Sequence, residues 1–399
     1  MIRPLFSVGT ARGGTNLLCK MLSVHPEIAL AADPYLPLFR SLRNAILRRA
    51  ADPQTRGAVD PAAPLDDYYF SRTKWLALEE IQSASLDLPF DSSERPGLLE
   101  AMAARARLSS SHVVPFLEGL RGDSYEALFR SALGILEKAS EAEGRRWVGF
   151  NENWAVEFLP TLARSFPEAK FIIFLRDPRG PIASALRDWD LPKIPHVLSF
   201  ARHWRKALAL AVKYGRSPLF RNRLHLLTYE ELVGEPERCA RTLCGFLDVG
   251  FDPGMLDTER YRDADGSRWK GNSHQGAAGP GIYTSSLRAW EKTLPPEAVE
   301  LIEFVCDPDM ELLGYAPERF QAEDRLGAGA LRFLEEDSRG CRGWRSDSGD
   351  PEQEIRNELS RRALLREEVQ EPDPWQVRTA FLDEALLPKL KKQRRVSIG

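Results

Sequence analysis

Cysteine, long apolar runs and an excess of one charge are all scarce in this chain of 399 residues. The five cysteines are scattered and form no Cys-x-x-Cys pair, which argues for reduced thiols and against a metal site or a disulfide framework. No run of about 18 apolar residues occurs and the N-terminus lacks a signal-peptide core, so we expect no membrane span and a soluble, cytoplasmic protein. The formal net charge of −3 provides no basic field for nucleic acid.

The apolar residues, 43% of the chain, suffice for one large α/β domain, alone or with an appendage. The most informative stretch comes first. Leu5–Val8 is predicted to be a buried strand, Gly9–Gly14 a glycine-rich turn, and Thr15–Leu22 the start of a helix with one apolar face. Glycines let the backbone approach an anion, and the unpaired amides of a helix start point at it. This stretch therefore predicts an oxyanion site, with an ordinary glycine-containing turn as the alternative.

The groups that this loop lacks narrow the choice of oxyanion. A nucleotide-hydrolysing P-loop reads GxxxxGK[ST], with the Lys on the β- and γ-phosphates and the hydroxyl on Mg²⁺. Aligned on Gly9, this chain has Thr15 at the Lys position and Asn16 at the hydroxyl position. Its cation is Arg12, inside the loop, where a guanidinium can bind a phosphate or its bridging oxygen without a metal. A P-loop kinase-like phosphotransferase remains an alternative, which these two missing groups oppose.

A second charged motif follows the apolar run 170–175, which has the composition of a parallel strand buried on both faces. Arg176 stands at the carboxyl end of this strand, where open α/β sheets bind ligands, and Ser184 lies two turns into the next helix. A guanidinium and a hydroxyl that converge there suit a phosphate monoester. Asp177 is expected to cap that helix and Arg179 to be a solvated charge.

Both motifs resemble those of one known family. The sequence of residues 9–18, followed by His25-Pro26, resembles the 5′-phosphosulfate loop of sulfotransferases that use 3′-phosphoadenosine 5′-phosphosulfate, in the variant with Arg found in bacterial members and in tyrosylprotein sulfotransferases. Arg176 and Ser184 match the family's 3′-phosphate motif in spacing. The resemblance implies sulfuryl transfer to a hydroxyl, or less readily an amine, of a small-molecule, carbohydrate or peptide acceptor, without a metal. It assigns the 5′-phosphosulfate to Arg12, which would also stabilise the leaving oxygen, and to the amides of Gly13, Gly14, Thr15 and Asn16.

Three positions depart from the family's usual pattern. Members usually have Ser where this chain has Gly13, Thr where it has Asn16, and a Lys in the segment that here contains Glu152. One expected cation of the transition state is therefore unaccounted for. These departures keep open a catalytically impaired member with a nucleotide-binding or scaffolding role.

Asp33 has two interpretations. Asp followed by Pro34 is a common helix start, with Asp as the N-cap of a helix that would run to about Arg49. By the resemblance, Asp33 also falls where tyrosylprotein sulfotransferases carry the Glu that is thought to act as catalytic base. The two roles are compatible, and His25 is expected to be a helix-end residue rather than a catalyst.

A late glycine-rich loop resembles the family's second cosubstrate loop. In it, Arg268, Lys270 and Gly271 are assigned to the cosubstrate, with the two cations near the 3′-phosphate. Asn272 and Ser273 would approach the transferring group, and Ser273 is thus a third catalytic candidate beside Asp33 and Arg12. Solvated charges on an irregular loop are the simpler interpretation.

The chain is expected to form an α/β fold with a P-loop-like central parallel sheet flanked by helices. The sulfotransferase domain would span 1–317, with a helical cap at about 50–145 whose aromatic residues either contact the acceptor or pack in the core. A charged helical extension, 318–399, would be either a solvated, partly disordered appendage or an arm for a second subunit or protein partner. The predicted strands are 27–32, 147–150, 170–175 and 223–227, and the predicted later helices include 154–166, 197–214, 236–247 and 285–294.

Overall fold

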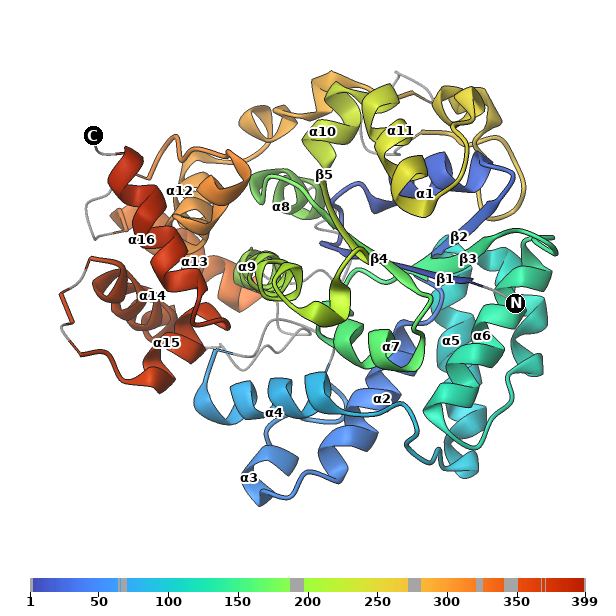
Figure 1. Ribbon diagram of the computed structural model, residues 1–399. Coiled ribbons are helices and arrows are strands. Elements are labelled where there is room, and N and C mark those ends of the chain that lie inside the picture. Colours follow the sequence, from blue (N-terminus) through green and yellow to red (C-terminus); the bar gives the residue numbers. More distant parts are fainter. Residues whose placement is uncertain are drawn as a thin grey trace.

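A computed structural model describes residues 3–63, 65, 70–186, 197–271, 281–320, 326–340, 351–366, 368, 369 and 371–397. At its centre is a parallel sheet of five strands in the order β2-β3-β1-β4-β5 (Figure 1). The strands are β1 (Arg3–Gly9), β2 (Ile28–Ala32), β3 (Trp147–Asn151), β4 (Lys170–Leu175) and β5 (Leu224–Thr228). The α/β class and the parallel sheet predicted from the sequence are confirmed.

The first strand of the chain is the middle strand of the sheet. β1 pairs with β3 on one side and with β4 on the other, in registers that align Ser7 with Asn151 and Gly9 with Phe174. Because all strands are parallel, the segments after β1, β3 and β4 leave the sheet at the same edge. The predicted phosphate loop, the segment around Glu152 and Arg176 are therefore neighbours at this edge.

Helices cover both faces of the sheet. Successive residues of β1 face opposite sides, so that Leu5 packs in one apolar cluster with α1, α10 and α11, whereas Phe6 and Val8 pack in the other with α2, α7 and α9. Figure 1 shows α1, α10 and α11 above the sheet, α2 and α7 below it, and α9 to the left of β4 and β5. The bounds of these helices are α1 (Thr15–Val24), α2 (Leu36–Arg48), α7 (Leu159–Ser165), α9 (Val197–Gly215), α10 (Tyr229–Gly234) and α11 (Pro236–Leu247).

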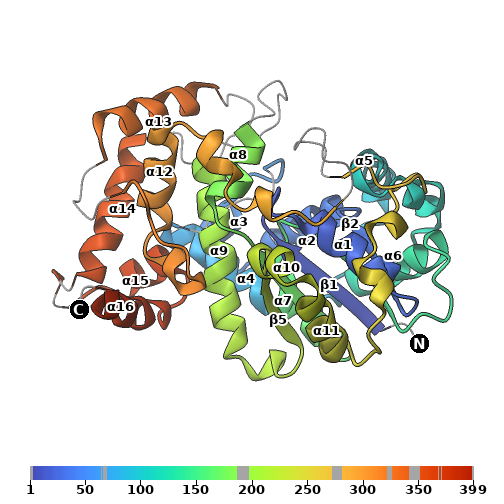
Figure 2. The ribbon, with the colours of Figure 1, turned by 90° about the horizontal axis from the view of Figure 1, so that it is seen from above.

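The insertion between β2 and β3 is helical, as predicted. Its last helices border the sheet edge: Ser110, just after α5, donates through its hydroxyl to Ala32 O (2.7 Å) and accepts from Ala32 N (3.1 Å). Figure 2 shows α5 and α6 beside α1 and β2. The end of α5 is thus fixed directly beside the carboxyl end of β2. The insertion contains α3 (Pro53–Arg56), α4 (Arg72–Ser83), α5 (Arg95–Ser109), α6 (Tyr125–Ala139) and the 3₁₀ segments Ser92–Glu94 and Ser111–Gly119.

The C-terminal helices pack against the core and are not a solvated appendage. Arg361 and Arg362 of α14 are each 1% exposed; Arg361 donates to Asp307 O (2.9 Å) and Arg362 to Phe304 O (2.6 Å). From α9, Arg205 pairs with Glu358 at 3.0 Å. Figure 1 shows these helices gathered beside α9, and they are α12 (Pro296–Cys306), α13 (Ala328–Gly340), α14 (Pro351–Leu365), α15 (Pro374–Phe381) and α16 (Leu386–Ser397).

Two predicted helices are wrong in part. Residues 285–294 form two 3₁₀ segments, Thr284–Ser286 and Ala289–Lys292, and the helix predicted for 154–166 consists of a 3₁₀ turn at Val156–Phe158 followed by α7. The remaining 3₁₀ segments are Pro218–Phe220, Pro253–Leu256, Thr258–Arg260 and Asp309–Leu313.

Of the aromatic residues of the helical insertion that were considered for the acceptor site, Trp75 packs edge-on against Trp375, and Tyr68 and Tyr69 lie outside the described residues.

Candidate active site

The loop after β1 forms a tight turn with an open helix start. Gly13 N donates to Thr10 O at 2.9 Å, and both Arg12 (φ 64°) and Gly14 (φ 93°) have left-handed backbones. Gly14 is the N-cap of α1, which has no side-chain cap and no acidic residue in its first turn. Thr15 is buried and Asn16 exposed at this helix start. Neither a side-chain cap nor an acidic residue of the first turn therefore offsets the partial positive charge of this helix start, as an anion site requires.

Tyr229 closes one side of this loop, a role that was not predicted from the sequence. A Cβ atom at Gly14 would lie 2.4 Å from Cδ2 of the Tyr229 ring, so only glycine fits there. The ring also lies against Arg176, whose guanidinium carbon is 4.2 Å from the ring centroid. Tyr229 thus connects the phosphate loop with the second predicted motif.

Arg176 stands at the end of β4, as predicted, and is held on several sides. It is 8% exposed, Nη2 donates to Ser286 O at 2.5 Å, and its carbonyl oxygen accepts from Trp204 Nε1 at 2.7 Å. Nε of Arg176 has no hydrogen-bond partner among the described residues. Ser184 is half-buried in α8 (Arg179–Leu186), which begins three residues after Arg176.

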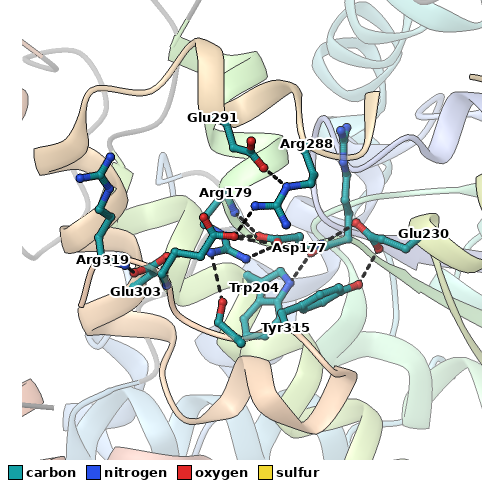
Figure 3. Close-up of polar contacts among 12 residues, drawn as sticks. Asp177, Arg179, Trp204, Glu230, Arg288, Glu291, Glu303, Tyr315 and Arg319 are labelled. Carbon is teal, nitrogen blue, oxygen red and sulfur yellow. Dashed lines mark hydrogen bonds and ion pairs between the residues drawn. The ribbon is translucent and has the colours of Figure 1, made fainter. Parts of the chain in front are cut away.

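A buried ion-pair network supports Arg176, which corrects the expectation for Arg179 (Figure 3). Arg179 is 3% exposed and is not a solvated charge: Nη2 pairs with Asp177 at 2.6 Å and Nη1 with Glu303 of α12 at 2.7 Å. Asp177 also accepts from Arg179 N at 3.0 Å, which confirms it as a cap of α8. Glu230 accepts from Asp177 N and from the Tyr315 hydroxyl, and burial raises the pKa of Glu230 above its ordinary value. The network fixes the start of α8 relative to α10 and α12.

Asp33 is not the N-cap of the helix that follows it, which corrects one of its two interpretations. The helix α2 begins at Leu36, its N-cap is Tyr35, and Asp33 has a left-handed backbone with φ 49°. The acceptor for the Tyr35 amide is the carboxylate of Glu152, which is 1% exposed and comes from the end of β3. Glu152 thus performs the capping that was expected of Asp33.

Asp33 is 8% exposed, and polar groups surround its carboxylate. Oδ1 accepts from Asn151 Nδ2 (3.2 Å) and from the backbone amide of Asn153 (3.3 Å), and Oδ2 accepts from Asn153 Nδ2 (3.1 Å). Arg105 of α5 completes the set, with Nη2 3.3 Å from Oδ2. Every one of these groups donates to the charged carboxylate, and none was identified from the sequence.

A buried histidine connects the two loops. His203 of α9 is fully buried, and its Nε2 lies 3.1 Å from Gly9 O and 2.9 Å from Asn153 O, so Nε2 carries the proton and donates. Burial lowers the pKa of His203 to about 3, which keeps the ring neutral.

His25 ends α1, as expected. It is the C-cap of this helix, and Nε2 of its ring lies 2.7 Å from Gly250 O.

The late loop is described only in part. Arg268 is exposed and paired with Glu259, Lys270 is exposed, and Gly271 has a left-handed φ of 88°. Lys20 of α1 donates to Arg262 O, which places this segment against the helix of the phosphate loop. Asn272, Ser273 and His274 lie outside the described residues.

Within the described part of the chain, no group of three or more His, Cys, Asp or Glu side chains is arranged to hold a metal ion. The described cysteines, Cys19, Cys239, Cys244 and Cys306, are all buried free thiols. None of the helices in the described ranges has the length and apolar character that a membrane crossing needs.

Comparison with known proteins decides the family. The model of the Sulfotransferase family matches residues 4–253. The chain belongs to this family. The matched part of the sulfotransferase chain contains the phosphate loop, Asp33, Arg105 and Arg176, and it ends before the loop with Arg268.

The names of its curated relatives refer to different acceptors, protein tyrosine in some and carbohydrate in another. Protein-tyrosine sulfotransferase A of Caenorhabditis elegans is 26% identical over 162 residues, 39% of this chain and 41% of the relative. Protein-tyrosine sulfotransferase 1 of Danio rerio is 27% identical over 172 residues (41% and 47%), and carbohydrate sulfotransferase 3 of Tetronarce californica is 24% identical over 178 residues (40% and 39%). The chain spans less than half the length of each of these three relatives. Among solved structures, the sulfotransferase domain from the curacin biosynthetic pathway is 17% identical, with a TM-score of 0.43 over 80% of this chain and 99% of that chain.

Proposed function

We propose that the protein transfers a sulfuryl group from 3′-phosphoadenosine 5′-phosphosulfate to a hydroxyl group of an acceptor. The observation that carries this proposal is the family match over a loop whose helix start is uncapped and whose cation, Arg12, lies inside the turn. A second cation, Arg176, directly follows the adjacent strand β4, and the Tyr229 ring lies against both Arg176 and Gly14.

The cosubstrate would bind across the two neighbouring strands β1 and β4. The amides from Gly13 to Asn16 and the guanidinium of Arg12 would hold the 5′-phosphosulfate, and Arg176 with Ser184 the 3′-phosphate. Arg268, Lys270 and Gly271 precede the part of the late loop in which Ser273 would approach the transferring group. Arg268, once released from Glu259, and the exposed Lys270 would be available for the 3′-phosphate.

In the transfer step, Asp33 would accept the proton of the acceptor hydroxyl. The acceptor oxygen forms its bond to sulfur in line with the bridging oxygen, whose bond to sulfur breaks, so adenosine 3′,5′-bisphosphate leaves. Arg12 and the helix amides would stabilise the negative charge that develops on the bridging oxygen. Protein cations suffice for this charge, so the proposal includes no metal.

Adenosine 3′,5′-bisphosphate is the probe that tests the binding half of the proposal. A ligand that binds only the folded protein at 100 times its Kd adds about 2.7 kcal/mol of stability. For a chain of 399 residues this corresponds to roughly 3 °C in Tm, because the entropy of unfolding scales with length. We expect that shift with the bisphosphate and little shift with ATP and Mg²⁺; the reverse result would instead support a kinase-like protein.

The transfer half is tested with ³⁵S-labelled phosphosulfate and a panel of phenols, oligosaccharides and tyrosine peptides. Transfer to any of these acceptors would establish the reaction. A protein that binds the bisphosphate tightly but transfers the sulfuryl group neither to an acceptor nor to water would instead have a scaffolding role. That alternative is suggested by Glu152, which stands where the family usually has a Lys.

A further inference from the structure

The two groups proposed for the 3′-phosphate lie on different elements. Arg176 directly follows β4, whereas Ser184 lies in the second turn of α8. Their side chains can converge on one phosphate only while α8 keeps a fixed orientation relative to β4. The contacts that fix the start of α8 therefore decide the geometry of this site.

The guanidinium of Arg176 packs against the first turn of α8. A Cβ atom at Gly180 would lie 2.6 Å from Nε and 2.9 Å from Cζ of Arg176, so the guanidinium contacts the backbone of Gly180 directly. Gly180 N donates to Asp177 O at 2.9 Å, which holds this turn to the residue after Arg176. A shift of the turn would thus move the support of Arg176 together with the helix that carries Ser184.

Arg179 connects this turn to a helix that is distant in the sequence. Its backbone amide and its Nε donate to Oδ1 of Asp177, at 3.0 and 2.9 Å, and its Nη1 donates to Oε1 of Glu303 at 2.7 Å. Its guanidinium carbon lies 4.1 Å from the centroid of the Trp290 ring. Figure 3 shows Arg179 between Asp177 and Glu303. Because a guanidinium is rigid and planar, contacts at both of its ends fix its orientation.

Glu303 is held by four donors. It is 0% exposed, and its Oε1 accepts from Arg179 Nη1 and from Glu318 N at 3.0 Å. Oε2 accepts from the backbone amides of Arg319 (2.7 Å) and Phe320 (2.8 Å). A carboxylate suits this position because both of its oxygens accept, whereas an amide would place its NH₂ group against two donors. Glu303 lies beyond residue 253, where the family match ends.

The C-terminal helices contact the residues on which the position of Glu303 depends. Arg362 of α14 donates to Phe304 O at 2.6 Å, and its guanidinium carbon lies 4.3 Å from the centroid of the Phe320 ring. Phe304 follows Glu303 on α12, and Phe320 donates to the Glu303 carboxylate. The extension after residue 317 thus supports the group that holds Arg179.

We propose that Glu303 is a positioning residue of the 3′-phosphate site: through Arg179 it fixes the first turn of α8. That turn sets where the guanidinium of Arg176 and the hydroxyl of Ser184 lie. This inference rests on the proposed function, in which these two groups bind the 3′-phosphate of the cosubstrate. Four protein donors occupy the oxygens of Glu303, so its loss should act on affinity for the 3′-phosphate and not for the 5′-phosphosulfate.

The readout is the ratio of two affinities measured by isothermal titration. Adenosine 3′,5′-bisphosphate uses both phosphate sites and adenosine 5′-phosphate only one, so the ratio of their Kd values isolates the 3′-phosphate. A destabilised but folded protein has a lower Tm and an unchanged ratio. Glu303→Gln should lower the preference for the bisphosphate by at least about 10-fold, within the 10- to 100-fold range of a charge-assisted contact.

Glu300→Gln is the matched control. Glu300 lies one turn earlier on α12 and also accepts from a backbone amide, that of Gly327 at 2.6 Å, so this variant removes the same charge from the same helix. Its preference for the bisphosphate should equal that of the wild type. If Glu303→Gln does not fold, Arg179→Lys tests the same connection. It keeps a positive charge between the two carboxylates, but one ammonium lacks the fork that contacts both, so the preference should again fall.

Gly180→Ala tests the support of Arg176 without changing a buried ion pair. The added methyl group would lie 2.6 Å from Arg176 Nε, and because this side chain is flexible, the protein should fold with the guanidinium displaced. Alanine also stabilises a helix relative to glycine. The preference should fall by at least about 10-fold while Tm is unchanged or raised. Gly134→Ala, in α6 with no atom within 4 Å of the new Cβ, should keep the preference.

A double-variant cycle shows whether Glu303 acts through Arg176. In the Arg176→Ala background, Glu303→Gln should lower the preference much less than it does in the wild type. An unchanged preference in Glu303→Gln and Arg179→Lys would overturn the inference and leave the proposed function intact. Tighter bisphosphate binding, as expected if only the negative charge of Glu303 mattered, would do the same. A wild-type protein that binds both ligands equally would overturn the 3′-phosphate site and this inference with it.

Discussion

Replacing Asp33 with Asn is the most direct test of the proposed chemistry, because the structure separates its effects on folding from its effects on catalysis. Asparagine accepts a left-handed backbone about as well as aspartate does, so the φ of 49° at this position is not a source of strain in the variant. The amide of Tyr35 is capped by Glu152, not by Asp33, so the start of α2 is unaffected.

The expected cost in stability is small and arises at one oxygen position. The Oδ1 of asparagine can still accept from Asn151 and Asn153, whereas its NH₂ group faces Arg105 Nη2 and Asn153 Nδ2, both of which contact Oδ2 of Asp33. The lost ion pair is partly exposed, so about 1–2 kcal/mol is a reasonable magnitude. At this chain length Tm should fall by roughly 1–2 °C.

The expected cost in turnover is much larger. Loss of a general base typically lowers the rate by about 10²–10⁴-fold, and bisphosphate binding should not change because Asp33 contacts neither predicted phosphate site. The assay is single-turnover transfer from ³⁵S-labelled phosphosulfate, beside a thermal melt with and without adenosine 3′,5′-bisphosphate. A rate within about threefold of wild type, at an unchanged Tm, would refute Asp33 as the base.

Three further changes have separate expected outcomes. Arg176→Ala should weaken bisphosphate binding roughly 10- to 100-fold and adenosine 5′-phosphate binding little, since a charge-assisted contact is worth about 1.5–3 kcal/mol; equal losses in isothermal titrations would make Arg176 structural. Gly14→Ala, with φ 93° and 2.4 Å from Tyr229, should lower Tm and abolish bisphosphate binding, whereas Gly245→Ala, with open space around it, should not; normal binding in Gly14→Ala would contradict the role of this loop in holding the phosphosulfate. For Glu152→Gln, the raised pKa of Glu152 means that folding favours its protonated form, so wild-type stability is lost as pH rises from about 4.3 toward the folded pKa. The Tm of this variant relative to wild type should therefore rise from pH 4.5 to pH 8, and a constant difference would show that Glu152 ionises normally.

The sequence was most informative where function depends on local backbone structure. The strand, turn and helix at 3–24 and the placement of Arg176 after β4 depend on apolar periodicity and on glycine, which are properties of adjacent residues. The residues proposed to bind the cosubstrate fall in these stretches, so their positions at one edge of the sheet could be predicted.

The side chains that contact Asp33 could not be predicted, because they are distant from Asp33 in the sequence. Asn153 follows β3 and Arg105 belongs to the insertion, and no local pattern relates them to residue 33. The assignment of Asp33 as N-cap failed for the same reason: tertiary packing supplied Glu152 as the acceptor. The prediction of a solvated Arg179 is wrong because its partner Glu303 lies on α12, 124 residues later.

Two of the three departures from the family's usual pattern, Gly13 and Glu152, have packing reasons, and this weakens the case for an impaired member. A Cβ atom at Gly13 would lie 2.7 Å from Thr10 Oγ1 and 2.8 Å from Thr10 O, so a serine cannot fit this turn without changing it. Glu152 stands where a lysine is usual, yet it is buried as the cap of α2 and its charge is suppressed. A buried neutral acid does not cancel the field of nearby cations, as an ionised one would. The cation that the structure describes beside Asp33 is Arg105 of the insertion, whose Nη2 lies 3.3 Å from Oδ2.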